Sequence, residues 1–128
     1  MKTKICIIAI FSLIIVSFFV LEETYVKHTL FDISEKSKQI VEQIQNDTDD
    51  EEIMSSLDTA YNNWKQNEYN LCFLYNHKDL LEIGKELNQA KSYIEKANKD
   101  EAYVHMLLLQ EDLQELDQII GFDFCNIF

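Results

Sequence analysis

The sequence lacks proline and arginine altogether and contains only two glycines, Gly84 and Gly121, among its 128 residues. Sheet proteins of this size need more turn residues, so the composition favours an all-α fold. The apolar share of 47% is ordinary for a packed domain and argues against a disordered chain. At this length we expect one domain with at most one appended segment.

Positive charge is also scarce, and it is unevenly placed. The chain has a net charge of −12, and Lys2 and Lys4 are the only charged residues before Glu22, so residues 22–128 carry −14. A nucleic-acid partner needs a basic surface, and so does flat adsorption of a domain on anionic lipid. We therefore expect no nucleic-acid partner.

The most informative segment is residues 5–21, an uncharged run between Lys4 and a pair of glutamates. As a helix it spans about 25 Å, at the short end for a bilayer crossing, and Lys4 and Tyr25 can reach the two interfaces. Positive charge on the N-terminal side alone predicts a cytoplasmic N-terminus. We predict a single-pass protein of the cell membrane. Residues 1–4 are cytoplasmic, residues 5–21 are a transmembrane signal anchor in contact with lipid, and residues 22–128 form an extracytoplasmic helical domain.

Two alternatives remain open for this segment. A cleaved signal peptide begins in the same way, but it needs small residues at positions −3 and −1 of its cleavage site. The run instead ends in four large residues at 18–21, and a site after Ser17 would place Ile15 at −3. A buried helix of a soluble core is the other alternative, and the lack of any polar face argues against it. The pattern favours the uncleaved anchor.

Apolar residues recur in alternating steps of four and three along four segments, as in the helices of a bundle. No breaker follows the apolar run, so we predict one helix over about residues 5–46. Capping boxes at Thr48–Glu51 and Asn98–Glu101 predict two further helix starts. We place the remaining break between Gln66 and Lys78. The predicted buried positions are Val26, Leu30, Ile33, Ser37, Ile40 and Ile44; Ile53, Leu57, Ala60 or Tyr61, and Trp64; Leu80, Ile83, Leu87, Ala90, Ile94 and Ala97; and Ala102, Met106, Leu109, Leu113, Leu116 and Ile120.

Four amphipathic helices with short connections predict an antiparallel four-helix bundle with coiled-coil-like seams. The fourth helix then returns to the membrane end, and Gly121 is expected to bend or end it. The apolar residues within 122–128 either close the core of the bundle or lie beside Tyr25 and Leu30 at the headgroup boundary.

Several short motifs occur in the order typical of one uncharacterised bacterial family. They are Trp64 in the second helix, the run Asn76–Ile83, the pair Tyr93–Ile94 and the terminal Asn126–Phe128. With the lysine-bearing N-terminal segment, this order resembles the domain-of-unknown-function family four-three-six-three over nearly the whole chain. Leu71 departs from the pattern, where an aromatic residue is more frequent, as do two positions of the Asn76–Ile83 run. The resemblance implies a membrane-anchored bacterial helical protein, without an established site or activity.

The sequence contains no recognisable metal-site motif. A di-iron bundle needs a glutamate three residues before a histidine, but a tyrosine, a leucine and an alanine precede His28, His77 and His105 at that distance. The acidic run Asp47–Glu52 lacks the glycine and the spacing of a calcium loop, which favours a solvated helix start. His77 is either a buried polar residue bonded to a carboxylate or an exposed residue at a helix boundary.

The cysteines offer little chemistry. Cys6 has the character of a small apolar residue within the apolar segment. Cys72 and Cys125 form either a disulfide or two free thiols, and free thiols are favoured, because a cysteine count does not by itself specify a pairing. A catalytic pair of Cys72 with His77 or His105 has no supporting motif.

We expect no catalytic residue, no bound metal and no cofactor, and therefore not an enzyme. The favoured function is that of a non-catalytic accessory or scaffold protein, held by its anchor beside another membrane or envelope protein. The seams also permit self-association. The alternative is an extracytoplasmic, sensor-like bundle that responds to a ligand or cation and signals through a partner.

Overall fold

The computed structural model describes the backbone of residues 2–125 and the side chains of residues 3–120. Within these residues the chain forms four α-helices and no strand: α1 (Lys2–Gln45), α2 (Asp50–Leu71), α3 (His77–Glu95) and α4 (Lys99–Cys125). The all-α prediction is therefore confirmed. The first helix is uninterrupted, as the lack of a breaker predicted, and the break between α2 and α3 falls inside the predicted window.

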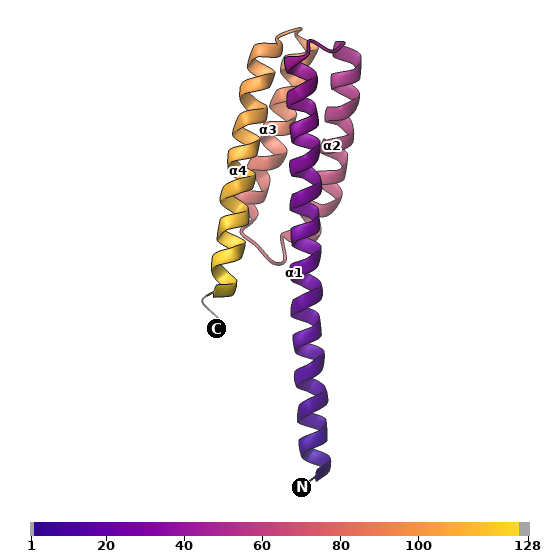
Figure 1. Ribbon diagram of the computed structural model, residues 1–128, viewed down its shortest axis with the longest axis vertical. Coiled ribbons are helices and arrows are strands. Elements are labelled where there is room, and N and C mark those ends of the chain that lie inside the picture. The colour runs from indigo at the N-terminus through magenta and orange to yellow at the C-terminus, as the bar shows by residue number, and fades with distance from the viewer. Residues whose placement is uncertain (1, 126–128) are drawn as a thin grey trace.

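Consecutive helices run antiparallel and pack as a four-helix bundle (Figure 1). α1 and α3 each pack against both α2 and α4. The N-terminal part of α1 projects beyond the other helices at one end of the bundle. α4 runs back to this same end. We call this the proximal end, which also holds the connection between α2 and α3. The distal end holds the other two connections (Figure 1).

The core is built from one apolar stripe on each helix, at the four-three spacing found in the sequence. Four members with 0% exposure, one from each helix, are Val26, Ile53, Leu87 and Met106. Ser37 is equally buried, and its hydroxyl has no hydrogen-bond partner among the described residues. Of the alternatives on α2, Ala60 is buried and Tyr61 is only partly so. Because a buried leucine or isoleucine contributes about 1.5–3 kcal/mol, these stripes supply the main stabilisation of the bundle.

Ala97 was predicted as a core residue, and this prediction is wrong. Ala97 has a φ of 54°, in the left-handed region, and is exposed. Its N–H donates to the carbonyl oxygen of Ile94 at 2.9 Å, and the N–H of Asn98 donates to that of Tyr93 at 2.9 Å. This bond pair is a Schellman motif, which ends α3. The apolar spacing does not detect the point at which the backbone reverses.

The capping box predicted at Thr48 is also wrong, because Thr48 completes the end of α1. Asp47 has a φ of 53°, and its N–H donates to the carbonyl oxygen of Ile44 at 3.2 Å. The N–H of Thr48 donates to that of Gln43 at 2.9 Å, which forms a second Schellman motif. The residue that precedes α2 is Asp49, whose side chain makes no capping hydrogen bond.

The other helix ends agree better with the sequence. The N–H of Glu101 donates to Oδ1 of Asn98 at 3.2 Å, which confirms the predicted cap of α4. Gly121 does not end α4, which continues to Cys125. A glycine inside a helix costs only about 1 kcal/mol relative to alanine, so a long helix tolerates it. The structure does not describe the side chains of residues 122–128, so the prediction of where they lie stays a prediction.

Candidate functional site

The first candidate site is the apolar surface of α1 over residues 5–21. Every large side chain in this range is at least half exposed, with values between 50% at Ile15 and 70% at Leu21. The first buried residue of α1 is Val26, which is 0% exposed. Among the described residues, this is the one helix long and apolar enough to cross a membrane. A contiguous apolar surface of this size is unfavourable in water.

The apolar surface is joined to the bundle without a flexible linker. α1 is one helix through both regions, so the orientation of the apolar part determines that of the bundle. Tyr25, four residues after Leu21, ties α1 to α2: its hydroxyl donates to Oδ1 of Asn67 at 2.6 Å. Nδ2 of Asn70 lies 3.4 Å from the same hydroxyl oxygen. The packed domain therefore starts within about one helical turn of the apolar run.

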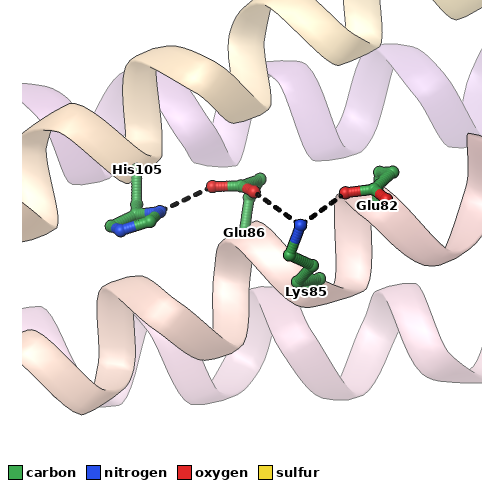
Figure 2. A network of polar contacts seen from close by, with 4 residues as sticks. All are labelled: Glu82, Lys85, Glu86 and His105. Atoms are coloured by element: carbon green, nitrogen blue, oxygen red, sulfur yellow. Dashed lines mark hydrogen bonds and ion pairs between the residues drawn. The ribbon is translucent and has the colours of Figure 1, made fainter.

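The second candidate site is a polar network between α3 and α4, formed by Glu82, Lys85, Glu86 and His105 (Figure 2). Nδ1 of His105 lies 2.6 Å from Oε2 of Glu86. Figure 2 shows His105 reaching from α4 toward Glu86, and Lys85 between the two glutamates of α3. Nζ of Lys85 lies 2.9 Å from Oε2 of Glu82 and 3.9 Å from Oε1 of Glu86. We call these four residues the α3–α4 network.

Both side chains of the His105–Glu86 pair are largely buried. The side chain of Glu86 is 8% exposed and that of His105 is 19% exposed. The ring of Tyr93 stacks on the imidazole, with centroids 5.2 Å apart and planes at 16°. The ring of His105 is thus held in place on one side by an aromatic face and on the other by a buried carboxylate. A buried carboxylate requires such a partner, because leaving it unpaired is costly.

Acidic groups outnumber basic ones around this network. The hydrogen bond from Lys85 lowers the pKa of Glu82, and Glu82 raises the pKa of Lys85 in return. On α4, partial burial raises the pKa of Asp112, and the negative charges of Glu86 and Glu82 raise it further. The interface of α3 and α4 therefore carries repulsion among carboxylates, which Lys85 offsets only in part.

The chemistry available to the α3–α4 network is proton binding and the positioning of two helices. Nowhere in the described residues do three histidine, cysteine, aspartate or glutamate side chains lie close enough to hold a metal ion. From the sequence, His105 was considered as a di-iron ligand, which was excluded, and as a partner for Cys72; the structure pairs it with Glu86 instead. Glu86 was not singled out from the sequence. Its position one residue before the buried Leu87 was the signal, since it places a carboxylate at the edge of the α3 stripe.

The structure does bring Cys72 and His77 together. Sγ of Cys72 lies 2.9 Å from Nδ1 of His77, across the connection between α2 and α3. His77 is exposed at the first residue of α3, as one of the two predictions for it stated. Within the described side chains no carboxylate contacts His77, so the pair lacks the third group that orients a catalytic base. The contact follows from the short loop, which brings residues five apart in sequence into reach.

The remaining cysteines add nothing to this pair. Among the described side chains Cys72 has no disulfide partner, and neither has the exposed Cys6 on the apolar part of α1. The side chain of Cys125 lies outside the described residues, so its pairing with Cys72 stays a prediction.

The acidic run at 47–52 is bound by a lysine of the chain itself. Nζ of Lys99, at the start of α4, lies 2.6 Å from Oδ1 of Asp47 and 3.2 Å from Oδ1 of Asp50. It also donates to the carbonyl oxygen of Thr48 at 2.7 Å. These contacts lower the pKa of Asp47 and raise that of Lys99. The run therefore serves to join the two distal connections.

Fold and site together define a four-helix bundle with an apolar helical extension. The profile of the family described as "Domain of unknown function (DUF4363)" matches residues 20–127. The chain belongs to this family, which confirms the resemblance found in the sequence. The match covers the bundle and begins at the end of the apolar run. Neither the curated proteins nor the solved structures that were searched gave a match.

Proposed function

We propose that the protein is a non-catalytic, membrane-anchored accessory or scaffold protein, whose bundle contacts another membrane or envelope protein outside the cytoplasm. The observation that carries this proposal is the apolar surface of residues 5–21, exposed along its whole length on a helix that continues into the bundle. A hydrocarbon environment would cover that surface. The lysines before it and the glutamates after it support a cytoplasmic N-terminus.

A surface on the bundle wall supports contact with a protein partner. A groove of about 430 Å³ lies between α1 and α4, lined among others by Phe31, Lys27 and Lys38. The side chain of Phe31 is 67% exposed. An exposed phenylalanine flanked by lysines is unusual on so acidic a chain, and aromatic residues of this kind anchor protein interfaces. The groove lies beyond the apolar run along α1, on the part of the chain that faces water under this proposal.

Site-specific crosslinking in native membranes tests this function. A photoreactive phenylalanine analogue at Phe31 should give a discrete adduct with another membrane or envelope protein. The same analogue at Asn62, exposed on α2, is the matched control and should give none. Recovery of the full-length chain in the membrane fraction, with its bundle open to protease outside the cell, is the second expected result. A chain cleaved after the apolar run and released would contradict the anchor.

A second candidate function is a sensor-like bundle that responds to a ligand or cation and signals through a partner. The His105–Glu86 pair favours it, because a cation or ligand bound at this pair would change the charge at the interface of α3 and α4. Thermal unfolding of the full chain in detergent, with calcium, magnesium and zinc salts added in turn, tests this candidate. A rise in Tm with one cation that is lost in Glu86→Gln would support it. An unchanged Tm with every cation would favour the accessory function.

A further inference from the structure

Two of the most exposed large side chains of the bundle lie where α2 ends, Tyr69 in its last turn and Phe73 in the connection to α3. Phe73 is 75% exposed and Tyr69 is 70% exposed. The two rings meet edge to face, with centroids 5.5 Å apart and planes at 87°. We call these two residues the aromatic pair. Apolar rings that pack on one another and not on the core form a preformed surface, which indicates a contact outside the bundle.

The aromatic pair lies close to the level at which the apolar run of α1 ends. The contacts of Tyr25 with Asn67 and Asn70 align α1 with antiparallel α2. Phe73 lies two residues past the end of α2, about 4.5 Å beyond Asn70 if the rise of the helix is continued, and Leu21 precedes Tyr25 by four residues, about 6 Å. Both steps run toward the proximal end, so Phe73 and Leu21 reach nearly the same level. Figure 1 shows the connection beside α1, where α1 leaves the other helices.

The connections at the two ends of the bundle differ in charge, and the difference favours the proximal connection as the one near lipid. Residues 69–78 contain no acidic residue and include Lys78, in a chain with a net charge of −12. At the distal end, residues 47–52 and 100–101 are acidic at every position except Thr48. Anionic headgroups repel carboxylates, so the proximal connection is the one that tolerates close approach to a lipid surface. Flat adsorption of the whole acidic domain remains excluded by its charge.

From these observations we propose that the aromatic pair is a second membrane contact, with Phe73 and Tyr69 in the headgroup region of the bilayer that α1 crosses. Tyrosine and other aromatic side chains are favoured at this depth. Two contacts, one through α1 and one through the connection between α2 and α3, hold the bundle upright and prevent rotation about α1. The inference rests on the proposed anchor, and it adds the depth and the orientation of the domain.

Tryptophan fluorescence of the full chain in lipid nanodiscs tests this contact. Phe73→Trp places a reporter in the aromatic pair, while the native Trp64 is 1% exposed and contributes a constant background. Phe31→Trp is the matched control: Phe31 is similarly exposed, at 67% against 75% for Phe73, and it lies ten residues beyond Leu21, about 15 Å along α1. The quenchers are phospholipids brominated near the headgroup and iodide in the water.

The added emission of Phe73→Trp should be largely lost with brominated lipid, shifted to the blue and protected from iodide. That of Phe31→Trp should be lost with iodide and unaffected by the lipid. If both reporters respond to iodide alone while the chain stays in the nanodiscs, the second contact is wrong and the anchor stands. A chain that does not co-elute with nanodiscs overturns the anchor itself. Tyr69→Trp repeats the test if Phe73→Trp fails to fold.

Discussion

Nδ1 of His105 and Oε2 of Glu86 lie 2.6 Å apart, which pairs a carboxylate of 8% exposure across the interface of α3 and α4. His105→Leu removes the cross-helix partner and leaves the buried carboxylate without it. We expect the free energy of unfolding to fall by about 1–3 kcal/mol, the cost of an unsatisfied buried polar group. Urea unfolding of the full chain in detergent, followed by circular dichroism, measures the change.

The double variant His105→Leu/Glu86→Leu is the control for this prediction. Replacement of both partners by apolar side chains of similar size is often nearly neutral, so most of the lost stability should return. A double variant as unstable as His105→Leu alone would show that the loss came from packing and not from the pair.

The raised pKa of Asp112 predicts a stabilising substitution. Burial and the charges of Glu86 and Glu82 raise this pKa above its value in the unfolded chain, so the folded protein binds the proton more tightly. The contribution of Asp112 to stability is greatest at acidic pH and falls as the pH rises through the folded pKa. At neutral pH, Asp112→Asn should therefore raise the stability, by about 0.5 kcal/mol or less for a partly exposed site.

Thermal unfolding at pH 7 and at pH 3 measures this effect. Glu42→Gln, at an exposed position on α1, removes the same unit of charge and should change the Tm little. The gain in Asp112→Asn should shrink at pH 3. A gain that is equal at both pH values, or equal in Glu42→Gln, would rule out the local repulsion as its cause.

Gly84 has room for a methyl group. A Cβ there would lie 3.6 Å from Cδ1 of Trp64 and 3.5 Å from Nζ of Lys65, which are ordinary contact distances. Alanine also loses less backbone entropy than glycine inside a helix, so Gly84→Ala should stabilise the protein by about 1 kcal/mol. Gly84→Leu should destabilise it, because the longer side chain meets the Trp64 ring. Equilibrium unfolding of both variants tests this, and a destabilised Gly84→Ala would contradict the spacing.

Replacement of Ala97 by glycine should stabilise the protein, whereas the same replacement destabilises most helical proteins at other alanines. Its φ of 54° is unfavourable for a residue with a Cβ, by about 1–2 kcal/mol. Ala97→Gly should therefore raise the free energy of unfolding by about 1 kcal/mol. Ala90→Gly, at a fully buried position within α3, should lower it by at least as much. Equal losses in the two variants would show that Ala97 does not end the helix in the left-handed conformation.

The sequence predicted the helices and their buried faces because both depend on local pattern. A stripe that repeats every three or four residues faces the core wherever its helix packs, so positions such as Val26, Leu57 and Leu109 followed directly from spacing. The same local logic identified Asn98 as a cap. It failed at Thr48 and Ala97, where a left-handed residue ends the preceding helix and changes which residue begins the next element.

Only the tertiary structure decided which polar residues meet. The pairs His105–Glu86 and Lys99–Asp47 join residues from different helices or connections. The spacing of residues within one helix does not show how that helix is rotated or shifted relative to its neighbour. Likewise the sequence identified the apolar run at 5–21, but not that residues 69–78 lie near its end. The antiparallel packing of α2 on α1, aligned by Tyr25 and Asn67, brought them to one level. Local periodicity determined what is buried, and the packing of the bundle determined which side chains become neighbours.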